Sequence, residues 1–392
     1  MKLTALLALL LFVPAADAAT IREIPSPAGA NAAEPFLHAT RDGGALLSWL
    51  EPNAKKTALK FARYTNGNWT KPRTIVERDD LFVNWADFPS VIEDAKGALF
   101  AHWLQKSGKG TYAYDVMLAT SIDGGATWSA PFVLNRDGKE AEHGFATMVA
   151  LPGSGIGITW LDGRAMTGGD HDEHEGGGDM MLRYATVDAD GNVANEVMLD
   201  DRTCECCTTG MAMMDNGPLV VYRDRSADEI RDIAWVRTQG KKWDAPQPLR
   251  KDGWKINGCP VNGPQIDALG NRVATAWFTA ANDQPRVYVT FLHGQAYVVD
   301  DGKPLGRVDV VLLDEHTALV SWLEQTADNA EIRARIITRA GKRGPSLRIA
   351  DSGAARGTGF TRMARVGKDV WFTWTETKDG GKRVRVARYA DR

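Results

Sequence analysis

SIDGGATWSAP, residues 121–131, is the stretch of the sequence that decides the fold. In a stretch of this kind the Asp123 side chain accepts hydrogen bonds from its own turn, and the two glycines adopt a positive φ without steric cost. Trp128 then packs beneath the hairpin that the turn closes. Related stretches occur at residues 65–72 (TNGNWTKP) and 239–246 (QGKKWDAP). We therefore expect a repeated β-hairpin whose polar groups are used by the turn itself and not by a ligand.

A second phrase recurs seven times: an apolar strand that ends in an aromatic residue followed by polar residues. The aromatic residues are Trp49, Trp103, Trp160, Tyr222, Trp277, Trp322 and Trp374. Their spacing of about 45 to 62 residues is typical of four-stranded propeller blades. The sequence predicts an all-β protein, a β-propeller with seven blades or, as the alternative, six.

Both ends of the chain contribute to this prediction. The last unit stops at residues 383–390 without a fourth strand, and residues 20–25 form a short strand-like stretch. We expect the N-terminal strand to complete the last blade, which leaves no long unpaired edge. Residues 1–18 have the basic start, apolar run and small-residue cleavage site of a signal peptide. Residues 19–392 are then a single exported propeller domain, periplasmic or extracellular.

Charge and hydropathy exclude two classes of partner. The formal net charge of −3 and the pI near 6.2 provide no basic excess for phosphates, so we expect no nucleic-acid partner. No stretch after the signal peptide reaches the roughly 18 apolar residues of a membrane span. The sequence carries no indication of an oligomeric state.

Conspicuous side chains fall on one face of the expected propeller. The loop after each second strand opens on the same side as the link into the next first strand. Second-strand ends and the loops after them give Arg164, Tyr222, Arg223, Asp224, Glu229, Arg231 and Glu324. Links into first strands give Trp85, Asp87, His143, Asn262, Arg307, Arg356 and Arg362. These residues either surround a central mouth that binds a ligand, or tie neighbouring blades together through charge-assisted hydrogen bonds.

The four cysteines belong to the same face. Cys204, Cys206 and Cys207 share one link, Cys259 lies in the next, and we expect all four to be neighbours in space. In an exported protein an even number favours disulfides, here from one of the first three to Cys259. The alternative is a thiolate site for Cu or Zn, with His143 as a further potential ligand.

A glycine-rich loop at residues 168–179 carries His171 and His174 among carboxylates. This spacing is compatible with a divalent metal ion. The flanking glycines equally indicate a solvated insert without metal, because flexibility raises the cost of ordering a site.

With these stretches and residues 161–164 (LDGR), the chain resembles the sialidase-like propellers with BNR repeats, or Asp-boxes, and is similar to exported bacterial proteins labelled exo-α-sialidase. The resemblance covers essentially all of residues 19–392. It implies three arginines that grip a substrate carboxylate, a Tyr nucleophile assisted by Glu, and an Asp acid/base. The candidates are Arg164, Arg223, Arg231 and Arg307 for the clamp, and Tyr222, Asp224, Glu229 and Glu324 for the chemistry. Sialidases have six blades, and the two cysteine stretches look like a subgroup signature.

Three classes of function follow. The first is an exported sialidase-like propeller that binds an anionic or glycan ligand at its mouth and hydrolyses a glycosidic bond. The second is a propeller that binds a glycan or a protein without catalysis. The third is a periplasmic copper- or zinc-binding protein that uses the cysteine-bearing face.

Overall fold

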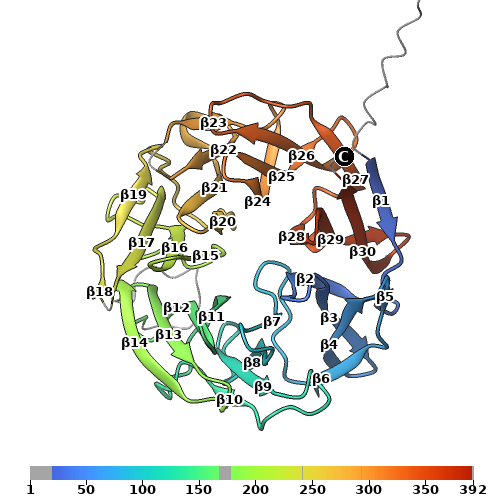
Figure 1. Cartoon of the computed structure of the whole chain (residues 1–392). Helices are drawn as coiled ribbons and strands as arrows, with labels where there is room; N and C mark the ends of the chain where they lie inside the picture. The colour runs from blue at the N-terminus through green and yellow to red at the C-terminus, as the bar shows by residue number, and fades with distance from the viewer. Residues whose placement is uncertain (1–19, 167–177, 241, 293, 391–392) are drawn as a thin grey trace, which may run out of the picture.

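The computed structural model describes residues 20–166, 178–240, 242–292 and 294–390, which form seven small antiparallel sheets arranged in a ring (Figure 1). Helix within these residues is confined to two short 3-10 turns, η1 (Ala281–Asp283) and η2 (Arg356–Thr358). The prediction of an all-β propeller with seven blades is therefore confirmed. The predicted signal peptide, residues 1–18, lies outside the described residues.

Each blade runs from an inner strand at the ring centre to an outer strand at its rim. The first three blades contain β2 (Ala33–Ala39), β3 (Ala45–Asn53), β4 (Lys56–Thr65), β5 (Asn68–Trp69) and β6 (Arg73–Arg78); β7 (Ser90–Glu93), β8 (Leu99–Lys106), β9 (Tyr114–Ser121) and β10 (Phe132–Val133); and β11 (His143–Ala150), β12 (Ile156–Asp162), β13 (Met181–Val187) and β14 (Val193–Asp200).

The fourth, fifth and sixth blades follow in chain order. They contain β15 (Gly210–Met214), β16 (Gly217–Arg223), β17 (Ile233–Gln239), β18 (Lys242–Trp243) and β19 (Gln247–Arg250); β20 (Gln265–Leu269), β21 (Arg272–Thr279), β22 (Arg286–Phe291) and β23 (Ala296–Val298); and β24 (Pro304–Asp314), β25 (Thr317–Gln325), β26 (Ala330–Thr338) and β27 (Leu347–Ser352).

The seventh blade joins the two ends of the chain. It contains β28 (Arg362–Val366), β29 (Asp369–Lys378) and β30 (Gly381–Ala390), and β1 (Thr20–Ile24) is its outer strand. β1 pairs antiparallel with β30 from Thr20↔Ala390 to Ile24↔Val386. The predicted completion of the last blade by the N-terminal strand is confirmed.

The recurring aromatic residues lie in the second strand of each blade and are buried between blades. Six of the seven, among them Trp160 and Trp322, are less than 2% exposed. Trp160 donates its indole N–H to Asp162 over 2.8 Å, and Trp322 donates to Glu324 in the same way. The acidic residue two positions after the tryptophan therefore has a structural partner in each of these blades, because it satisfies a buried N–H.

The Asp-box forms the predicted turn. Asp123 accepts hydrogen bonds from the Thr127 backbone N–H (3.0 Å) and hydroxyl (2.6 Å), and from the Ser121 hydroxyl (2.8 Å). Gly125 has a φ of 82°, and a Cβ there would lie 2.2 Å from Phe61 on the first blade. Trp128 packs edge-on against the same ring, with 5.8 Å between ring centroids. The motif thus fastens the second blade to the first.

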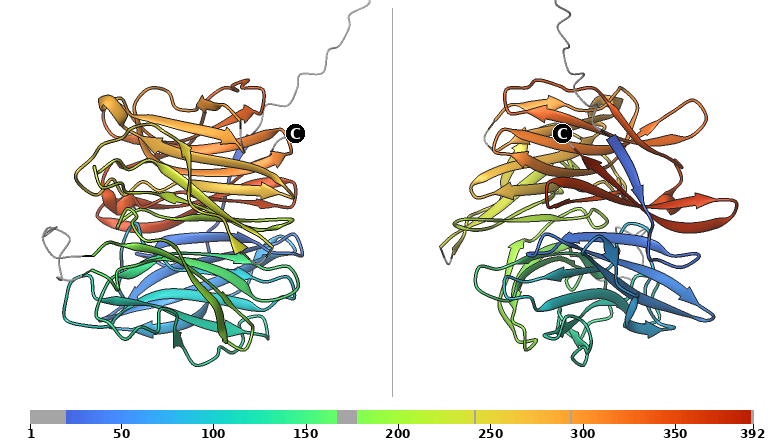
Figure 2. Two further views of the ribbon diagram at one scale, coloured as in Figure 1. Left: turned by 90° about the vertical axis from the view of Figure 1, so that its left-hand side faces the viewer. Right: turned by 45° about the vertical axis from the view of Figure 1, so that its right-hand side comes forward.

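The strands run across the thickness of the ring, so each blade carries loops at two opposite faces (Figure 2). Links into the inner strands lie beside the ends of second strands, as the bridges Leu81↔Gln105 and Thr203↔Asp224 show. We call this side the mouth face; it is the face expected to carry the candidate residues. Within the described residues no helix has the length and apolar character needed to cross a membrane.

Candidate functional site

A cavity of about 340 Å³ lies at the ring centre between the inner strands. Every blade contributes to its wall, because inner strands β2, β7, β11, β15, β20, β24 and β28 all supply residues. Part of the wall is aromatic (Phe36, Phe88, Phe145), and part is polar or charged (Asp87, Thr208, Asp309, Arg362). A cavity of this size lies within the range of small-molecule sites.

Arg362, the first residue of β28, is the buried cation of this cavity. The residue is 6% exposed, and its Nε and Nη1 atoms have no hydrogen-bond partner among the described residues. Its guanidinium carbon lies 4.6 Å from the centre of the Phe88 ring and 5.4 Å from that of Phe360. Burial lowers the pKa of Arg362, and nearby Asp309 opposes that shift. The guanidinium therefore has aromatic contacts but few acceptors.

Asp309 faces Arg362 from β24 on the neighbouring blade. Burial raises its pKa to about 6, while the Arg362 charge and the backbone N–H groups of Met363 and Val310 act in the opposite direction. The Met363 N–H donates to Asp309 over 2.7 Å. The charge balance of the cavity therefore changes near neutral pH, with Asp309 ionised above about pH 6.

An aromatic platform and two more arginines adjoin the cavity on the mouth face. Trp85 stacks on Phe360 with 5.8 Å between ring centroids and 14° between planes. The guanidinium carbons of Arg307 and Arg356 lie 5.1 and 5.9 Å from the Trp85 ring centre. Arg356 is exposed, whereas Arg307 donates to Thr358 Oγ1 (2.6 Å) and the Gly359 carbonyl (3.0 Å). Arg307 thus holds the link between the sixth and seventh blades.

Arg307, Arg356 and Arg362 share one property. Within the described part of the chain, no acidic side chain lies within ion-pair distance of any of them. Three guanidinium groups around Trp85, Phe88 and Phe360 therefore give this region an excess of positive charge. Such a region favours an anion.

A buried phenol and two carboxyl groups meet beside the cavity, and of the three only Asp87 is part of its wall. Tyr114 donates its hydroxyl to Glu142 over 2.7 Å, and its oxygen lies 3.4 Å from Asp87 Oδ2. Burial raises the pKa of Asp87 to about 8, and it raises that of Tyr114 well above its usual value. Sequence reasoning found Asp87 but missed Tyr114 and Glu142. The one available signal was the position of Glu142 directly before His143, at the start of an inner strand.

The fourth blade holds several predicted residues in one structural network. Arg223 is buried and donates to the Asn262 carbonyl (2.7 and 2.9 Å) and the Phe278 carbonyl (2.6 Å). Burial lowers its pKa to about 9. Tyr222 donates its hydroxyl to Asp200, and burial raises its pKa. The polar groups of both candidates are thus bound to neighbouring strands and links.

The acidic candidates have comparable partners. Glu229 accepts from Arg225 and Arg231, which lower its pKa against the effect of burial. Burial raises the pKa of Asp224 to about 6. Glu324 accepts from the Trp322 indole and from the Lys303 backbone N–H (2.7 Å). The structure thus places Glu324 in the sixth blade, apart from Asp224 and Glu229 of the fourth.

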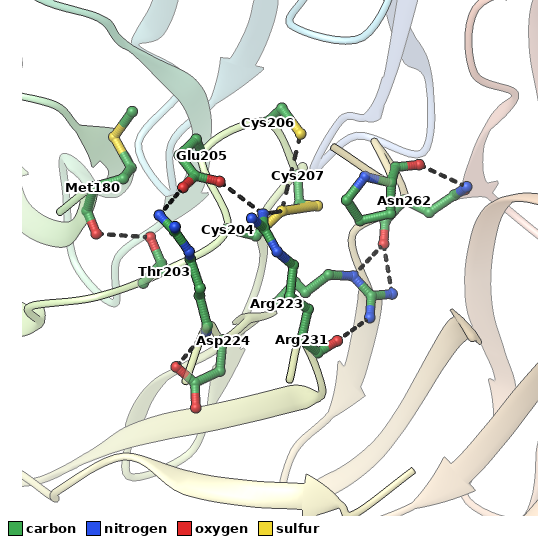
Figure 3. Close-up of a disulfide and its surroundings, with 12 residues drawn as sticks. Met180, Thr203, Cys204, Glu205, Cys206, Cys207, Arg223, Asp224, Arg231 and Asn262 are labelled. Atoms are coloured by element: carbon green, nitrogen blue, oxygen red, sulfur yellow. Dashed lines mark hydrogen bonds and ion pairs between the residues drawn. A yellow bond between two sulfur atoms is a disulfide. The ribbon is translucent and has the colours of Figure 1, made fainter. Parts of the chain in front are cut away.

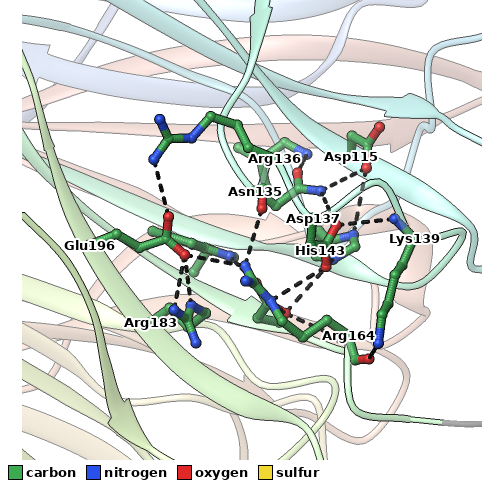
Figure 4. Close-up of polar contacts among 12 residues, drawn as sticks. Asp115, Asn135, Arg136, Asp137, Lys139, His143, Arg164, Arg183 and Glu196 are labelled. Atoms are coloured by element: carbon green, nitrogen blue, oxygen red, sulfur yellow. Dashed lines mark hydrogen bonds and ion pairs between the residues drawn. The ribbon is translucent and has the colours of Figure 1, made fainter. Parts of the chain in front are cut away.

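Arg164 and His143 belong to an ionic network between the second and third blades (Figure 4). Arg164 binds Asp162 at 2.6 Å, and His143 Nε2 lies 3.0 Å from Asp137 Oδ2. His143, Asp137 and Asp162 are close enough to form a potential metal site. Arg164 already contacts both carboxylates, at 3.4 Å for Asp137, so the cluster is charge-paired within the protein. His171 and His174 lie outside the described residues.

Cys204, Cys206 and Cys207 share one turn on the mouth face (Figure 3), and Cys259 contacts Cys206, so the four cysteines are neighbours as predicted. The disulfide joins Cys204 to Cys207, with 5.8 Å between Cα atoms. The expectation of a bond from one of these three to Cys259 differs from the structure, in which Cys206 and Cys259 are free thiols and the turn itself brings Cys204 and Cys207 within bonding distance. The Cys206 sulfur lies 4.0 Å from that of Cys204, and the Cys259 thiol is in hydrogen-bond contact with Cys206. Sulfur atoms at 204, 206 and 207 are spaced closely enough for a metal ion, but Cys204 and Cys207 are bonded to each other and offer no thiolate.

A group of buried ion pairs connects this turn to the fourth blade. Glu205 accepts from Arg225 and, over 2.7 Å, from Arg231, whose side chain is 1% exposed. Arg231 Nη1 also lies 3.5 Å from the Cys204 sulfur. Asn262, in the same link as Cys259, accepts from the Arg307 backbone N–H over 2.7 Å. The cysteine turn is therefore connected, through the link that carries Cys259 and Asn262, to Arg307 in β24.

Comparison with known proteins agrees with this architecture. Residues 51–286 match the family model described as a BNR repeat-like domain, and no curated protein matches the chain. A Dyadobacter fermentans protein of unknown function is similar over 95% of this chain and 99% of its own, with 14% identity and a TM-score of 0.53. Polysaccharide lyase Uly1 is similar over 91% and 89%, with 8% identity and a TM-score of 0.54. At sequence identities this low, the similarity shows a shared fold and nothing about function. Because the family model covers more than half of the chain, this protein belongs to the BNR repeat-like domain family.

Proposed function

We propose that this protein binds a small acidic carbohydrate in its central cavity, with Arg362 contacting the carboxylate or sulfate of the ligand. One observation carries the proposal: Arg362 is buried, lines the cavity, and has two nitrogens without a hydrogen-bond partner in the described part of the chain. Unpaired buried donors are costly, and an anion supplies charge-assisted acceptors for them. The positive charges of nearby Arg307 and Arg356 also favour an anionic ligand.

The rest of the cavity wall suits a sugar. Phe36, Phe88 and Phe145 offer apolar ring surface, and the buried Thr208 hydroxyl has no partner among the described residues. Asp87 is neutral below about pH 8, so it can donate to a hydroxyl group as well as accept from one. Apolar walls with a few placed polar groups are typical of ligand sites. We propose that this binding takes place in the periplasm or outside the cell, since residues 1–18 have the form of a signal peptide.

Isothermal titration with the full mature chain tests this proposal. N-acetylneuraminic acid and a glucuronic acid disaccharide serve as acidic probes, and N-acetylmannosamine and a glucose disaccharide as neutral counterparts. We expect binding of an acidic probe and at least a tenfold loss of affinity in Arg362→Gln, whereas Arg348→Gln removes the same charge from an exposed position and has no effect. Equal binding of neutral and acidic probes, or full affinity in Arg362→Gln, would refute the proposal.

A folding defect in Arg362→Gln is separated from a binding defect by a second variant. Arg362→Lys keeps the positive charge but loses the planar donor set, so we expect native circular dichroism with weakened binding. Wild-type affinity in a folded Arg362→Lys protein would show that only charge matters. Loss of binding in both variants with native spectra would support direct contact.

Glycan cleavage is the second candidate, and the group formed by Tyr114, Glu142 and Asp87 favours it. Asp87 lines the cavity and has a raised pKa, so it can move a proton to or from a bound sugar, with the Tyr114 hydroxyl and Glu142 behind it as further proton carriers. Turnover of aryl sialosides, or formation of unsaturated uronates from polyuronides, tests this candidate. Tyr114→Phe should abolish turnover and leave ligand affinity within about threefold, because Tyr114 contacts Asp87 but does not itself line the cavity.

A further inference from the structure

The sulfur atoms of the mouth face divide into two kinds. Cys204 and Cys207 form a buried disulfide. Cys206 is half-buried and Cys259 is exposed, and their thiols are in hydrogen-bond contact with each other. They come from different links, between β14 and β15 for Cys206 and between β19 and β20 for Cys259, so any bond between them would join neighbouring blades.

We propose that Cys259 and Cys206 form a reactive dithiol that exchanges with external disulfides, Cys259 as the attacking sulfur and Cys206 as the resolving one. The Cys259 thiolate attacks one sulfur of a disulfide RSSR, which forms a mixed disulfide and releases one thiolate RS⁻. Burial raises the pKa of Cys206, so its thiol passes its proton to the released RS⁻ as the sulfur attacks Cys259, and the second RS⁻ leaves. The two thiols lose two electrons in total, and the external disulfide gains them.

The exposure of each sulfur decides the order of attack. Cys259 is exposed to solvent, whereas Cys206 is half-buried. An external disulfide needs access to the attacking sulfur, while the resolving sulfur needs only contact with the first. The contact between the two thiols already meets the second requirement.

The disulfide between Cys204 and Cys207 is protected from the same reaction. Both residues are buried, at 0% and 2% exposure. Cys204 is also held by Arg231, whose own position is fixed by Glu205. Exchange at this site should therefore begin at Cys259 and leave the bond within the turn unchanged.

The new bond would act on the ligand site through one residue. Cys259 lies three positions before Asn262, which accepts from the Arg307 N–H through its side chain and from Arg223 through its carbonyl. Joining Cys206 to Cys259 fixes this link against the fourth blade. The dithiol is thus a modification site at the point where the cysteine turn meets the arginines of the mouth face.

Peptide mapping of the full mature chain treated with glutathione disulfide tests this proposal. In the wild type we expect a cross-linked Cys206–Cys259 peptide pair and the loss of two thiols that react with Ellman's reagent in denaturant. Cys206→Ser should stop at the mixed stage, with one glutathione on Cys259. Cys259→Ser should gain neither an adduct nor a cross-link. These readouts do not depend on ligand binding, so they can fail independently of the proposed function.

Three outcomes would overturn the assignment. One is a cross-link from Cys259 to Cys204 or Cys207. Another is a glutathione adduct on Cys206 in Cys259→Ser. The third is protein isolated with stoichiometric copper or zinc that shields both thiols, which would make the cluster a metal site. The first and third need only wild-type protein, because its peptide map shows the cross-link and its elemental analysis shows the metal, so the test stands even if a cysteine variant fails to fold.

Discussion

The guanidinium carbon of Arg362 lies 4.6 Å from the centre of the Phe88 ring, although 273 residues separate the two positions in the chain. Arg362 opens the inner strand of the seventh blade, and Phe88 precedes that of the second. A cation over a ring face gains about 0.5–2 kcal/mol without losing its charge. The contact therefore positions Arg362 without neutralising its charge, so the guanidinium can still pair with an anionic ligand.

Ligand affinity should depend on pH through Asp309. Its pKa is raised to about 6, so the carboxyl group is neutral below that pH and no longer offsets the Arg362 charge. We expect the affinity for a sialic acid, whose own carboxylate stays ionised, to rise as pH falls from about 7.5 to 5. Asp309→Asn should bind as tightly at pH 7.5 as the wild type does at pH 5. Titration calorimetry at both pH values checks this, and a pH-independent wild type would contradict it.

Asp87 should make the protein less stable as pH rises. Its folded pKa of about 8 lies above the ordinary value of 3.8, so between these values the unfolded chain releases a proton that the folded chain keeps. The free energy of unfolding therefore decreases through this window, by at most about 1.4 kcal/mol per pH unit. Urea denaturation from pH 5 to 8 should show a smaller decrease in Asp87→Asn. If the free energy of unfolding fell equally with pH in the wild type and in Asp87→Asn, the raised pKa of Asp87 would be contradicted.

Glu205 should contribute strongly to stability. It lies buried between Arg225 and Arg231, and Glu205→Gln leaves the Arg231 charge with Glu229 as its remaining partner. Breaking one side of a buried ion pair costs about 3–5 kcal/mol. Asp351→Asn is the matched control, because that carboxylate is 81% exposed and pairs only at the surface, where about 0–1 kcal/mol is expected. Equal denaturation midpoints for the two variants would contradict the buried role.

The N-terminal strand should be necessary for a stable ring. Deleting residues 1–24 removes β1 and leaves β30 as an unpaired edge, which invites pairing between molecules. We expect a lower unfolding temperature and concentration-dependent aggregation by light scattering. Deleting residues 1–19 keeps β1 and serves as the control. A monomeric deletion variant with unchanged melting would show that the three remaining strands of the seventh blade suffice.

The repeated sequence phrases made the fold predictable, and they also explain why Glu324 was chosen as a catalytic candidate. Trp160 and Trp322 mark their blades because each must be buried, and each brings an acid two positions later to bind its indole N–H. Glu324 was read as a candidate for chemistry, but its recurrence with the tryptophan is the signature of a structural pair. A polar residue that recurs at the same position of several blades is therefore expected to have a structural role before a catalytic one.

The candidate site was only partly predictable. Asp87, Arg307 and Arg362 were placed on the mouth face because propeller topology determines where the links into inner strands lie. The contact of Tyr114 with Glu142 depends on the path of a link, which short-range patterns do not specify. The pairing of Cys204 with Cys207 likewise depends on the conformation of a single turn.

The pairing of β1 with β30 has a consequence for biogenesis. β1 emerges from the ribosome first and its partner nearly last, so the ring stays open until translation has almost finished. A product truncated before β30 keeps an unpaired first strand and an incomplete seventh blade, and such unpaired edges are prone to aggregation. The architecture thereby makes completion of synthesis a condition for closing the ring.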